Sequence, residues 1–374
     1  MRIDRIEVRH VTMPLLYPWR TASHEIRAID SLLIKLTSGE LEAWAESCPF
    51  GAPDYSPEYA GGAFAMLRDW LAPAVAGAEI DSGALLQERL AHFKGNYFAK
   101  AAIDVAWWVL EARRVGMPLH TLLGGRRNRV EVGADFGVMD SLDDLVAAVD
   151  DAVRAGCRRV KLKFRPGWDI AMLEAVRSTF PDLTAHIDCN AAYRLSDLDL
   201  FRAVDRFELA MIEQPLQHDD LLDHAKLQAQ IDTPVCLDES IVSVKSAEHA
   251  VDLGSCRYVN VKPGRVGGLT VAGSIHDLCR DGGVPCWVGG MLESGVGAAV
   301  SLALATLDNF TYPADIFPSS RFYAEDLAEP AVSFETSSDG GWQAVAGEEA
   351  GIAPAPRPDL LERLTADRFV IEAP

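Results

Sequence analysis

VKLKF (160–164) is the first of five short apolar runs in the chain that each finish at a charged residue. The charged residues are Lys163, Asp188, Glu213, Asp238 and Lys262, and the intervals between them are 25, 25, 25 and 24 residues. One strand, one helix and their loops take about that many residues, so the spacing predicts repeated βα units. Where such units close into a barrel, the carboxyl ends of the strands share one rim. The five side chains are therefore predicted to meet there.

The chain is long enough for such a barrel and a second, smaller domain. It has 374 residues, 49% of them hydrophobic, whereas a (β/α)₈ barrel needs roughly 250 residues. Residues 1–48 have the pattern of strands with a loop at 17–25, and helices are expected near 58–76 and 98–115. The alternating βα pattern begins near residue 126. It is lost in the last fifty or so residues, which are expected to return to the first domain.

Charge and cysteine content exclude several classes of function. The net charge of −20 and the pI of about 4.8 disfavour binding to nucleic acid or to an anionic membrane. Seven cysteines without a CxxC pair indicate a reducing compartment rather than a disulfide framework. Neither a signal peptide nor an apolar run of membrane-spanning length is present. We therefore expect a soluble, cytoplasmic protein with a small-molecule substrate.

The five residues at the strand ends favour one kind of chemistry. Asp188, Glu213 and Asp238 are hard oxygen donors, a set that favours Mg²⁺, with Mn²⁺ as the alternative. Near a cation, and with Lys161 on the same strand face, the pKa of Lys163 is expected to be lowered, which would provide a neutral amine as base. A cation and an ammonium together stabilise the enediolate that forms when a proton is removed α to a carboxylate.

Two readings of a different class fit parts of this pattern. A buried strand lysine also suits a Schiff-base aldolase, although that mechanism does not need three carboxylates. A non-catalytic binding protein on the same fold is the other alternative. Degenerate copies of an active site usually lose a ligand or a lysine, and here none is missing.

The motifs at these positions resemble those of the enolase superfamily, muconate-cycloisomerase-like subgroup. The resemblance is most specific for the o-succinylbenzoate synthase / N-acylamino acid racemase family. It covers essentially the whole chain, and the motifs that carry it are KLK (161–163), DCN (188–190), EQP (213–215), LDES (237–240), NVKPGRVGG (260–268) and GGMLESG (289–295).

The resemblance implies the fold class α/β, a modified (β/α)₈ (TIM-like) barrel with an α+β capping domain. The expected boundaries are residues 1–125 for the capping domain, 126–320 for the barrel and 321–374 for a C-terminal segment that returns to the capping domain. Two mobile loops, near Trp19–His24 and Phe50–Tyr55, are expected to close over the substrate.

The resemblance also assigns roles to individual residues. Lys163 and Lys262 would be the catalytic acid/base pair on opposite faces of the substrate, and Asp188, Glu213 and Asp238 would bind Mg²⁺. Lys161, Asn190 and Glu239 would hold the ligands and lysines in place. The expected substrate pocket comprises Trp19, His24, Tyr55, Met291, Glu293 and Ser294.

The activity implied is o-succinylbenzoate synthase, the dehydration of 2-succinyl-6-hydroxy-2,4-cyclohexadiene-1-carboxylate in menaquinone biosynthesis. The alternative is N-acylamino acid (N-succinylamino acid) racemase, followed by dipeptide epimerase or muconate cycloisomerase. A homo-oligomer is expected. Three departures from the family pattern are Cys189, the WAES stretch (44–47) and Ala298, where family members commonly have arginine. Of these, Ala298 is expected to bear on specificity.

Overall fold

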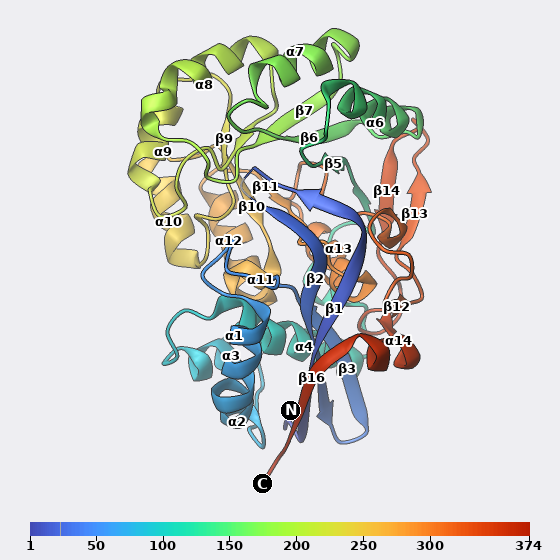
Figure 1. Ribbon diagram of the computed structural model, residues 1–374. Helices are drawn as coiled ribbons and strands as arrows, with labels where there is room; N and C mark the ends of the chain where they lie inside the picture. Colours follow the sequence, from blue (N-terminus) through green and yellow to red (C-terminus); the bar gives the residue numbers. More distant parts are fainter. Residues whose placement is uncertain (23) are drawn as a thin grey trace.

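The computed structural model describes residues 1–22 and 24–374, which form a parallel barrel sheet and a separate antiparallel sheet (Figure 1). Ser23, within the first predicted loop, lies outside the described residues. All seven cysteines are buried and free. Among the described residues, none of the helices has both the length and the apolar character needed to traverse a bilayer.

The barrel sheet confirms the predicted βα repeat. Its strands lie side by side in chain order, and every pairing between them is parallel. They are β5 (Ala134–Phe136), β6 (Arg159–Lys163), β7 (Thr184–Asp188), β8 (Ile212–Glu213), β9 (Val235–Leu237), β10 (Tyr258–Val261) and β11 (Cys286–Val288).

An irregular segment, residues 309–315, fills the position of the eighth strand. On one side, the backbone N–H groups of Thr311 and Asp315 donate to carbonyl groups of β11, at 3.0 and 2.9 Å. On the other side, Ala314 N–H donates to Glu131 O at 2.9 Å, and Gly133 N–H donates to Ala314 O at 3.2 Å. Because both edges of the sheet bind this segment, the ring closes and its carboxyl-end rim is continuous.

Helices form the outer layer around these strands (Figure 1). Ser141 caps the first of them, since its Oγ accepts a hydrogen bond from Asp144 N–H at 3.1 Å. The helices are α6 (Leu142–Arg154), α7 (Ile170–Thr179), α8 (Leu198–Val204) with 3₁₀ turns η2 (Leu195–Asp197) and η3 (Asp205–Phe207), α9 (Leu221–Gln228), α10 (Val244–Leu253), α11 (Pro263–Val266), α12 (Leu269–Asp281) and α13 (Gly295–Ala305).

The second sheet is antiparallel, in the order β16-β1-β2-β3, and pairs the two ends of the chain. Its strands are β1 (Arg5–Arg20), β2 (Glu25–Ser38), β3 (Leu41–Ser47) and β16 (Thr365–Glu372). Helix α4 packs against β2 and β3. The other elements of residues 60–122 are α1 (Ala60–Met66), the π-helical turn η1 (Leu67–Leu71), α2 (Ala72–Val75), α3 (Gly83–Leu90), α4 (Tyr97–Val115) and α5 (Leu119–Leu122). The pairing of β16 with β1 confirms that the C-terminal tail joins the N-terminal sheet.

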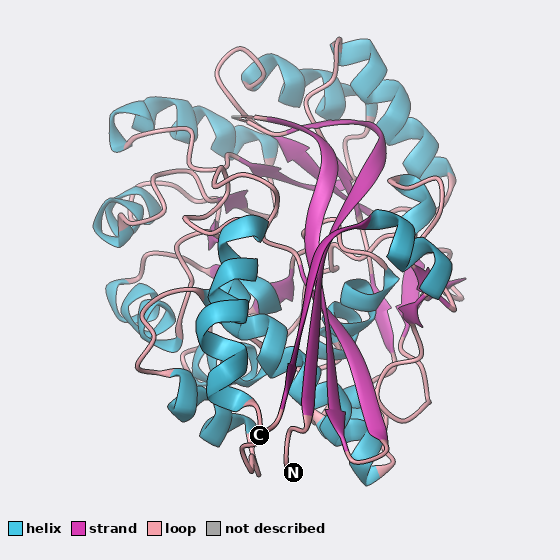
Figure 2. Ribbon diagram, turned by 60° about the horizontal axis from the view of Figure 1, so that its bottom comes forward, coloured by secondary structure: helices cyan, strands magenta, loops and turns pink. Residues whose placement is uncertain are grey.

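The first predicted loop is shorter than the sequence suggests. Strand pairing resumes after an irregularity following Pro14, with Trp19 opposite Ile26 and Arg20 opposite Glu25. The result is the long twisted β1–β2 ribbon in Figure 2. Its tip reaches the barrel, because Val138 N–H donates to Arg20 O at 3.0 Å.

The remaining C-terminal elements lie between the barrel and β16. Strands β13 and β14 form a small antiparallel sheet with β4, and β12 pairs with β15. Their bounds are β4 (Arg129–Glu131), η4 (Ser319–Arg321), β12 (Ala328–Glu329), β13 (Ser333–Thr336), β14 (Trp342–Val345), β15 (Ala355–Pro356) and α14 (Pro358–Leu364).

A buried carboxylate joins α4 to the barrel segment that follows β10. Asp104 is fully buried and accepts hydrogen bonds from Thr270 N–H at 3.0 Å, Thr270 Oγ1 at 2.6 Å and Gln87 Nε2 at 2.9 Å. Gly268 has φ +117°, and a Cβ there would lie 2.2 Å from Asp104 Oδ1. Burial raises the pKa of Asp104 to about 6, although the hydrogen bonds from Thr270 and Gln87 oppose the rise.

The Asp104 joint predicts a pH-dependent contribution to stability. The pKa is higher in the folded state than in the unfolded chain, so protonation stabilises the fold below about pH 4, and this contribution is lost as the pH rises through 6. Relative to Asp104→Asn, the wild-type free energy of unfolding should therefore increase by about 1.4 kcal/mol between pH 8 and pH 5. Urea unfolding of both proteins measures this difference, and a difference independent of pH would contradict it.

Candidate active site

The five residues predicted from the spacing all lie at the carboxyl-end rim of the barrel. Lys163, Asp188 and Glu213 are the last residues of β6, β7 and β8, and Asp238 and Lys262 directly follow β9 and β10. The strand register places Lys163 beside Asp188 and Asp188 beside Glu213. All five are buried, with at most 5% of their surface exposed. The five residues that are evenly spaced in the sequence therefore form a row of charged groups at the rim.

The two catalytic candidates occupy opposite ends of this row. Lys163 Nζ lies 2.6 Å from Asp188 Oδ2, and Lys262 Nζ lies 2.9 Å from Asp238 Oδ2. Glu213 lies between the two pairs, and Asn260 Nδ2 donates to its Oε1 at 2.7 Å. The row thus has an amine and its carboxylate at each end and a carboxylate in the middle.

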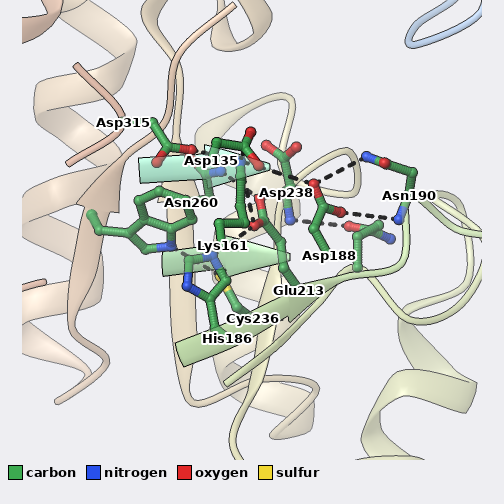
Figure 3. A network of polar contacts seen from close by, with 12 residues as sticks. Asp135, Lys161, His186, Asp188, Asn190, Glu213, Cys236, Asp238, Asn260 and Asp315 are labelled. Carbon is green, nitrogen blue, oxygen red and sulfur yellow. Dashed lines mark hydrogen bonds and ion pairs between the residues drawn. The ribbon is translucent and has the colours of Figure 1, made fainter. Parts of the chain in front are cut away.

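Lys161 lies among four carboxylates, two of which belong to the row (Figure 3). Its Nζ is 2.5 Å from Asp315 Oδ2 and 3.2 Å from Asp135 Oδ2, and it is 3.9 Å from both Asp188 and Glu213. Asp135 belongs to β5, and Asp315 belongs to the segment that closes the barrel. Sequence reasoning missed both because neither belongs to the 25-residue series.

The other two residues predicted to support the row contact each other. Asn190 Nδ2 lies 3.3 Å from both Asp188 Oδ2 and Glu239 Oε1, and Asn190 N–H donates to Asp188 Oδ1 at 3.0 Å. Asn190 has a left-handed backbone, with φ 42°. It therefore connects the end of β7 to the loop after β9.

The ring of His186 lies close to Glu213, the middle carboxylate of the row. His186 Nε2 lies 3.4 Å from Glu213 Oε2, and the other ring nitrogen lies 3.0 Å from the hydroxyl of Tyr312. Burial lowers the pKa of His186, although Glu213 opposes the shift. A neutral imidazole follows at neutral pH.

Arg265 is a residue of the site that the sequence reasoning did not select. Its guanidinium contacts Asp238 Oδ1 and donates to Ile241 O at 2.9 Å, to Asn260 O at 2.5 Å and to Tyr55 Oη at 2.8 Å. Arg265 belongs to α11 and to the NVKPGRVGG motif, but the direction of its side chain carries no sequence signal. Arg265 thus neutralises Asp238 at Oδ1, whereas Lys262 contacts Oδ2.

Tyr55, a residue of the capping domain, contacts two groups of the row. Its hydroxyl lies 3.2 Å from both carboxylate oxygens of Asp238 and 3.2 Å from Lys262 Nζ. Because Tyr55 belongs to the second predicted loop, this loop is closed against the rim in the structure.

The pKa values of both lysines are raised by the groups around them. Burial lowers the pKa of Lys163, but the carboxylates of Asp188 and Asp135 outweigh burial and raise it above its ordinary value, while Lys161 opposes them. The pKa of Lys262 is also raised, because Tyr55 and nearby carboxylates outweigh burial. The expectation of a lowered pKa applies to a rim that holds a cation, and it stays a prediction for that state.

The carboxylate row has the donor chemistry for a hard cation but is not arranged as a finished cage. Within residues 1–22 and 24–374, no three His, Cys, Asp or Glu side chains are grouped around one point as metal ligands. Ammonium, guanidinium and amide groups bind the carboxylates instead. Glu213 Oε2 and Glu239 Oε2 are nevertheless buried without a hydrogen-bond donor. Oxygen-only donors with unsatisfied lone pairs fit Mg²⁺.

A small enclosed cavity of about 50 Å³ lies above the row. Four of the predicted pocket residues line it, namely Trp19, His24, Tyr55 and Met291, together with Lys163, Asp188, Asn190 and Lys262. Ala298 lines a different cavity of about 20 Å³ beside Glu293.

Glu293 and Ser294, the other two predicted pocket residues, do not line the site cavity. Glu293 Oε2 accepts a hydrogen bond from Met291 N–H at 2.8 Å, which folds the 289–295 loop back on itself. Ser294 is the N-cap of α13 and donates to Glu46 Oε2 at 2.5 Å. Both residues therefore shape the loop that carries Met291 and do not face the cavity.

Gln214 connects the ends of β8 and β9. It is fully buried and has a strained backbone, with φ 38°. Its Oε1 accepts hydrogen bonds from Asp238 N–H at 3.0 Å and Ser240 N–H at 3.2 Å, and its Nε2 donates to Ser240 Oγ at 2.8 Å. Gln214 therefore fixes the position of Asp238 relative to Glu213, the residue that precedes Gln214.

Comparisons with known proteins identify two regions of the chain. Residues 4–124 match the family "Mandelate racemase / muconate lactonizing enzyme, N-terminal domain", and residues 144–338 match "Enolase C-terminal domain-like". An o-succinylbenzoate synthase of Geobacillus kaustophilus is 43% identical over 333 residues, 89% of each chain. An N-succinylamino acid racemase of Amycolatopsis is 41% identical over 99% of this chain and 100% of the relative. A solved enolase-superfamily structure from Listeria innocua superposes with a TM-score of 0.93 at 36% identity, covering 100% of this chain and 99% of the other.

Replacing Gln214 with alanine should impair both stability and turnover. Two buried N–H groups, those of Asp238 and Ser240, would lose their acceptor, which costs about 2–4 kcal/mol of unfolding free energy. Displacement of Asp238 should also lower kcat by about 10- to 100-fold. Urea unfolding and initial-rate assays measure the two effects.

Gln228→Ala provides a matched control. Gln228 is also buried and accepts from Val235 N–H at 2.6 Å, but at the opposite end of β9. It should lose comparable stability and keep its kcat. Equal kcat in the two variants would contradict a positioning role for Gln214.

Proposed function

The chain belongs to the enolase superfamily, and from this premise we propose that it removes the α-proton of a small carboxylate substrate to form an enediolate. The main reaction proposed is the dehydration of 2-succinyl-6-hydroxy-2,4-cyclohexadiene-1-carboxylate to o-succinylbenzoate. The observation that carries the proposal is the row of charged groups at the barrel rim, with Lys163 at one end and Lys262 at the other.

Asp188, Glu213 and Asp238 are the residues proposed to hold Mg²⁺, with Mn²⁺ as the alternative. A bound divalent cation supplies Lewis-acid stabilisation of the negative charge that develops on the substrate carboxylate. Glu213 Oε2 supports this assignment, because it is buried and its nearest donors, His186 Nε2 at 3.4 Å and Lys161 Nζ at 3.9 Å, are only long contacts. Asn190, whose amide also contacts Glu239, holds Asp188 in place, and Asn260 holds Glu213.

Lys163 is proposed as the base and then the acid of the dehydration. It takes the α-proton and returns it to the departing hydroxide. To accept a proton, Lys163 must first be neutral, and the Asp188 carboxylate at 2.6 Å is a main cause of its raised pKa. Any group that draws charge from Asp188 therefore makes Lys163 a better base.

Lys262 is proposed to remain an ammonium and to stabilise the enediolate from the other side. Its raised pKa supports the charged form at neutral pH, and Asp238 and Tyr55 orient its Nζ. The closed position of Tyr55 over the rim would exclude water from the reacting atoms, which strengthens every electrostatic interaction there.

Racemisation of N-succinylamino acids is the second candidate. Two observations favour it: the racemase from Amycolatopsis matches along almost the full chain, and each end of the row carries an amine. One lysine would remove the α-proton and the other would deliver a proton to the opposite face. Dipeptide epimerisation and muconate cycloisomerisation follow as candidates.

Dehydration and racemisation should be assayed side by side on the purified protein with Mg²⁺. We expect turnover of at least one substrate, and loss of both activities in Lys163→Ala and in Lys262→Ala. An exposed, ion-paired lysine on α10 provides the control, and Lys245→Ala should behave as wild type. If the wild type turns over neither substrate, the substrate assignment fails, whereas activity retained in both lysine variants would reject their catalytic roles.

Removal of divalent metal should abolish either activity. Dialysis against EDTA is expected to reduce turnover by more than about 100-fold, and Mg²⁺ or Mn²⁺ should restore it, because charge stabilisation by one electrophile contributes several kcal/mol to such reactions. Circular dichroism before and after dialysis checks that the fold persists. Full activity in EDTA would contradict the metal assignment.

A further inference from the structure

A second cavity, of about 310 Å³, adjoins the catalytic one beneath the tip of the β1–β2 ribbon. Trp19 and Asp135 line both cavities, so these two residues form the boundary between them. The catalytic cavity of about 50 Å³ is much smaller than ligand sites usually are, since these measure about 300–1,000 Å³. Any part of a substrate beyond its reacting carbon and carboxylate therefore needs additional space, and the neighbouring cavity offers it.

The walls of this cavity are mainly apolar. Tyr17, Phe136 and Met139 contribute to them, together with Trp19, whose ring meets Phe322 edge-on at 5.6 Å. Methylene groups are stabilised in such surroundings because they leave water without losing hydrogen bonds.

Arg321 is the cavity residue whose charge is not balanced by a carboxylate. Its Nη2 donates to the backbone carbonyl of Asp135 at 2.5 Å, and it forms no ion pair within the described part of the chain. Its guanidinium lies 5.1 Å from the ring of Phe136, 5.3 Å from that of Phe317 and 5.7 Å from that of Phe322. The aromatic rings hold the group in place and leave its other donors for a ligand.

The other two charged groups of the cavity are already paired. Arg20 binds Glu25 at 2.9 Å and Asp140 at 2.5 Å. The carboxylate of Asp135 binds the Lys161 ammonium at 3.2 Å. One positive charge, that of Arg321, is therefore available to an incoming anion.

We propose that this cavity, here called the Arg321 cavity, binds the distal succinyl arm of the substrate, with Arg321 as the counter-ion of its terminal carboxylate. The inference rests on the proposed function, since both candidate substrates carry this arm. A succinyl arm has two methylene groups that end in a carboxylate, which matches apolar walls with one free guanidinium. Arg321 thereby selects succinylated substrates over those with uncharged acyl groups.

Binding of o-succinylbenzoate and of 2-butanoylbenzoate tests the proposal without relying on turnover. The second compound replaces the terminal carboxylate with a methyl group. Isothermal titration with wild type and Mg²⁺ should give a dissociation constant about 10- to 100-fold lower for o-succinylbenzoate, as expected for a charge-assisted hydrogen bond. In Arg321→Met this ratio should fall to about 1, and in Arg321→Lys it should be intermediate, because a point charge remains without the planar fork.

Arg68→Met is the matched control, because Arg68 is exposed and paired with Asp69 in the capping domain. It should keep the wild-type ratio. A ratio near 1 in wild type, or a ratio unchanged in both Arg321 variants, would overturn the proposal. If free succinate abolishes the preference in wild type but leaves Arg321→Met unaffected, the carboxylate is confirmed as the recognised group.

Turnover of N-succinyl and N-butanoyl derivatives of one amino acid separates this inference from the proposed function. If the binding ratio depends on Arg321 but neither substrate is turned over, the cavity assignment stands and the catalytic proposal fails. If turnover occurs and the succinyl preference does not depend on Arg321, the catalytic proposal stands and the cavity assignment fails.

Discussion

The balance of buried charge at the barrel rim is the constraint on which the rest of the structure depends. Carboxylates and amines that are almost fully removed from water are tolerated only when each has a close partner of opposite charge. Lys163 with Asp188, and Lys262 with Asp238, meet this requirement at the two ends of the row. The surrounding charges also set the pKa values of the amines, since Asp188 raises that of Lys163, and Tyr55, Glu213 and Glu239 raise that of Lys262. One electrostatic arrangement therefore determines both the stability of the rim and its capacity to move protons.

Contacts at this rim connect the two domains. Tyr55 reaches from the capping domain to Asp238 and Lys262. Below it, Glu46 of β3 is buried and accepts hydrogen bonds from Ser294 Oγ and from backbone N–H groups at the start of α13. A carboxylate at a helix N-terminus is favourable. Because these contacts join the capping sheet to the loop that carries the cavity wall, movement of the cap would alter the shape of the substrate site directly.

The sequence predicted those features of the fold that recur at a regular interval along the chain. The 25-residue spacing predicted the strand ends, the parallel order and the gathering of the five charged residues, since strand direction fixes where each side chain emerges. Asp315 and Arg265 were not predicted as site residues. The paths of the loop segment and of the short helix that carry them cannot be read from the sequence. The direct contacts between the lysines and the carboxylates were not predicted, because the sequence shows which charges are near one another but not which atoms touch. Glu293 was predicted to line the cavity, but the loop motif that contains it does not indicate which of its side chains face inward.

Hydrogen exchange at the α-carbon of N-succinylamino acids tests the central claim most directly. Each enantiomer is incubated in ²H₂O with Mg²⁺ and the Lys163→Ala or Lys262→Ala protein, and loss of the α-proton signal is followed by NMR. If the amines lie on opposite faces of one bound substrate and either can remove its α-proton, as proposed for the racemisation, each variant should exchange one enantiomer only, and the two variants should retain opposite ones. Exchange of the same enantiomer by both variants, or of both enantiomers at the wild-type rate by either, would contradict the account.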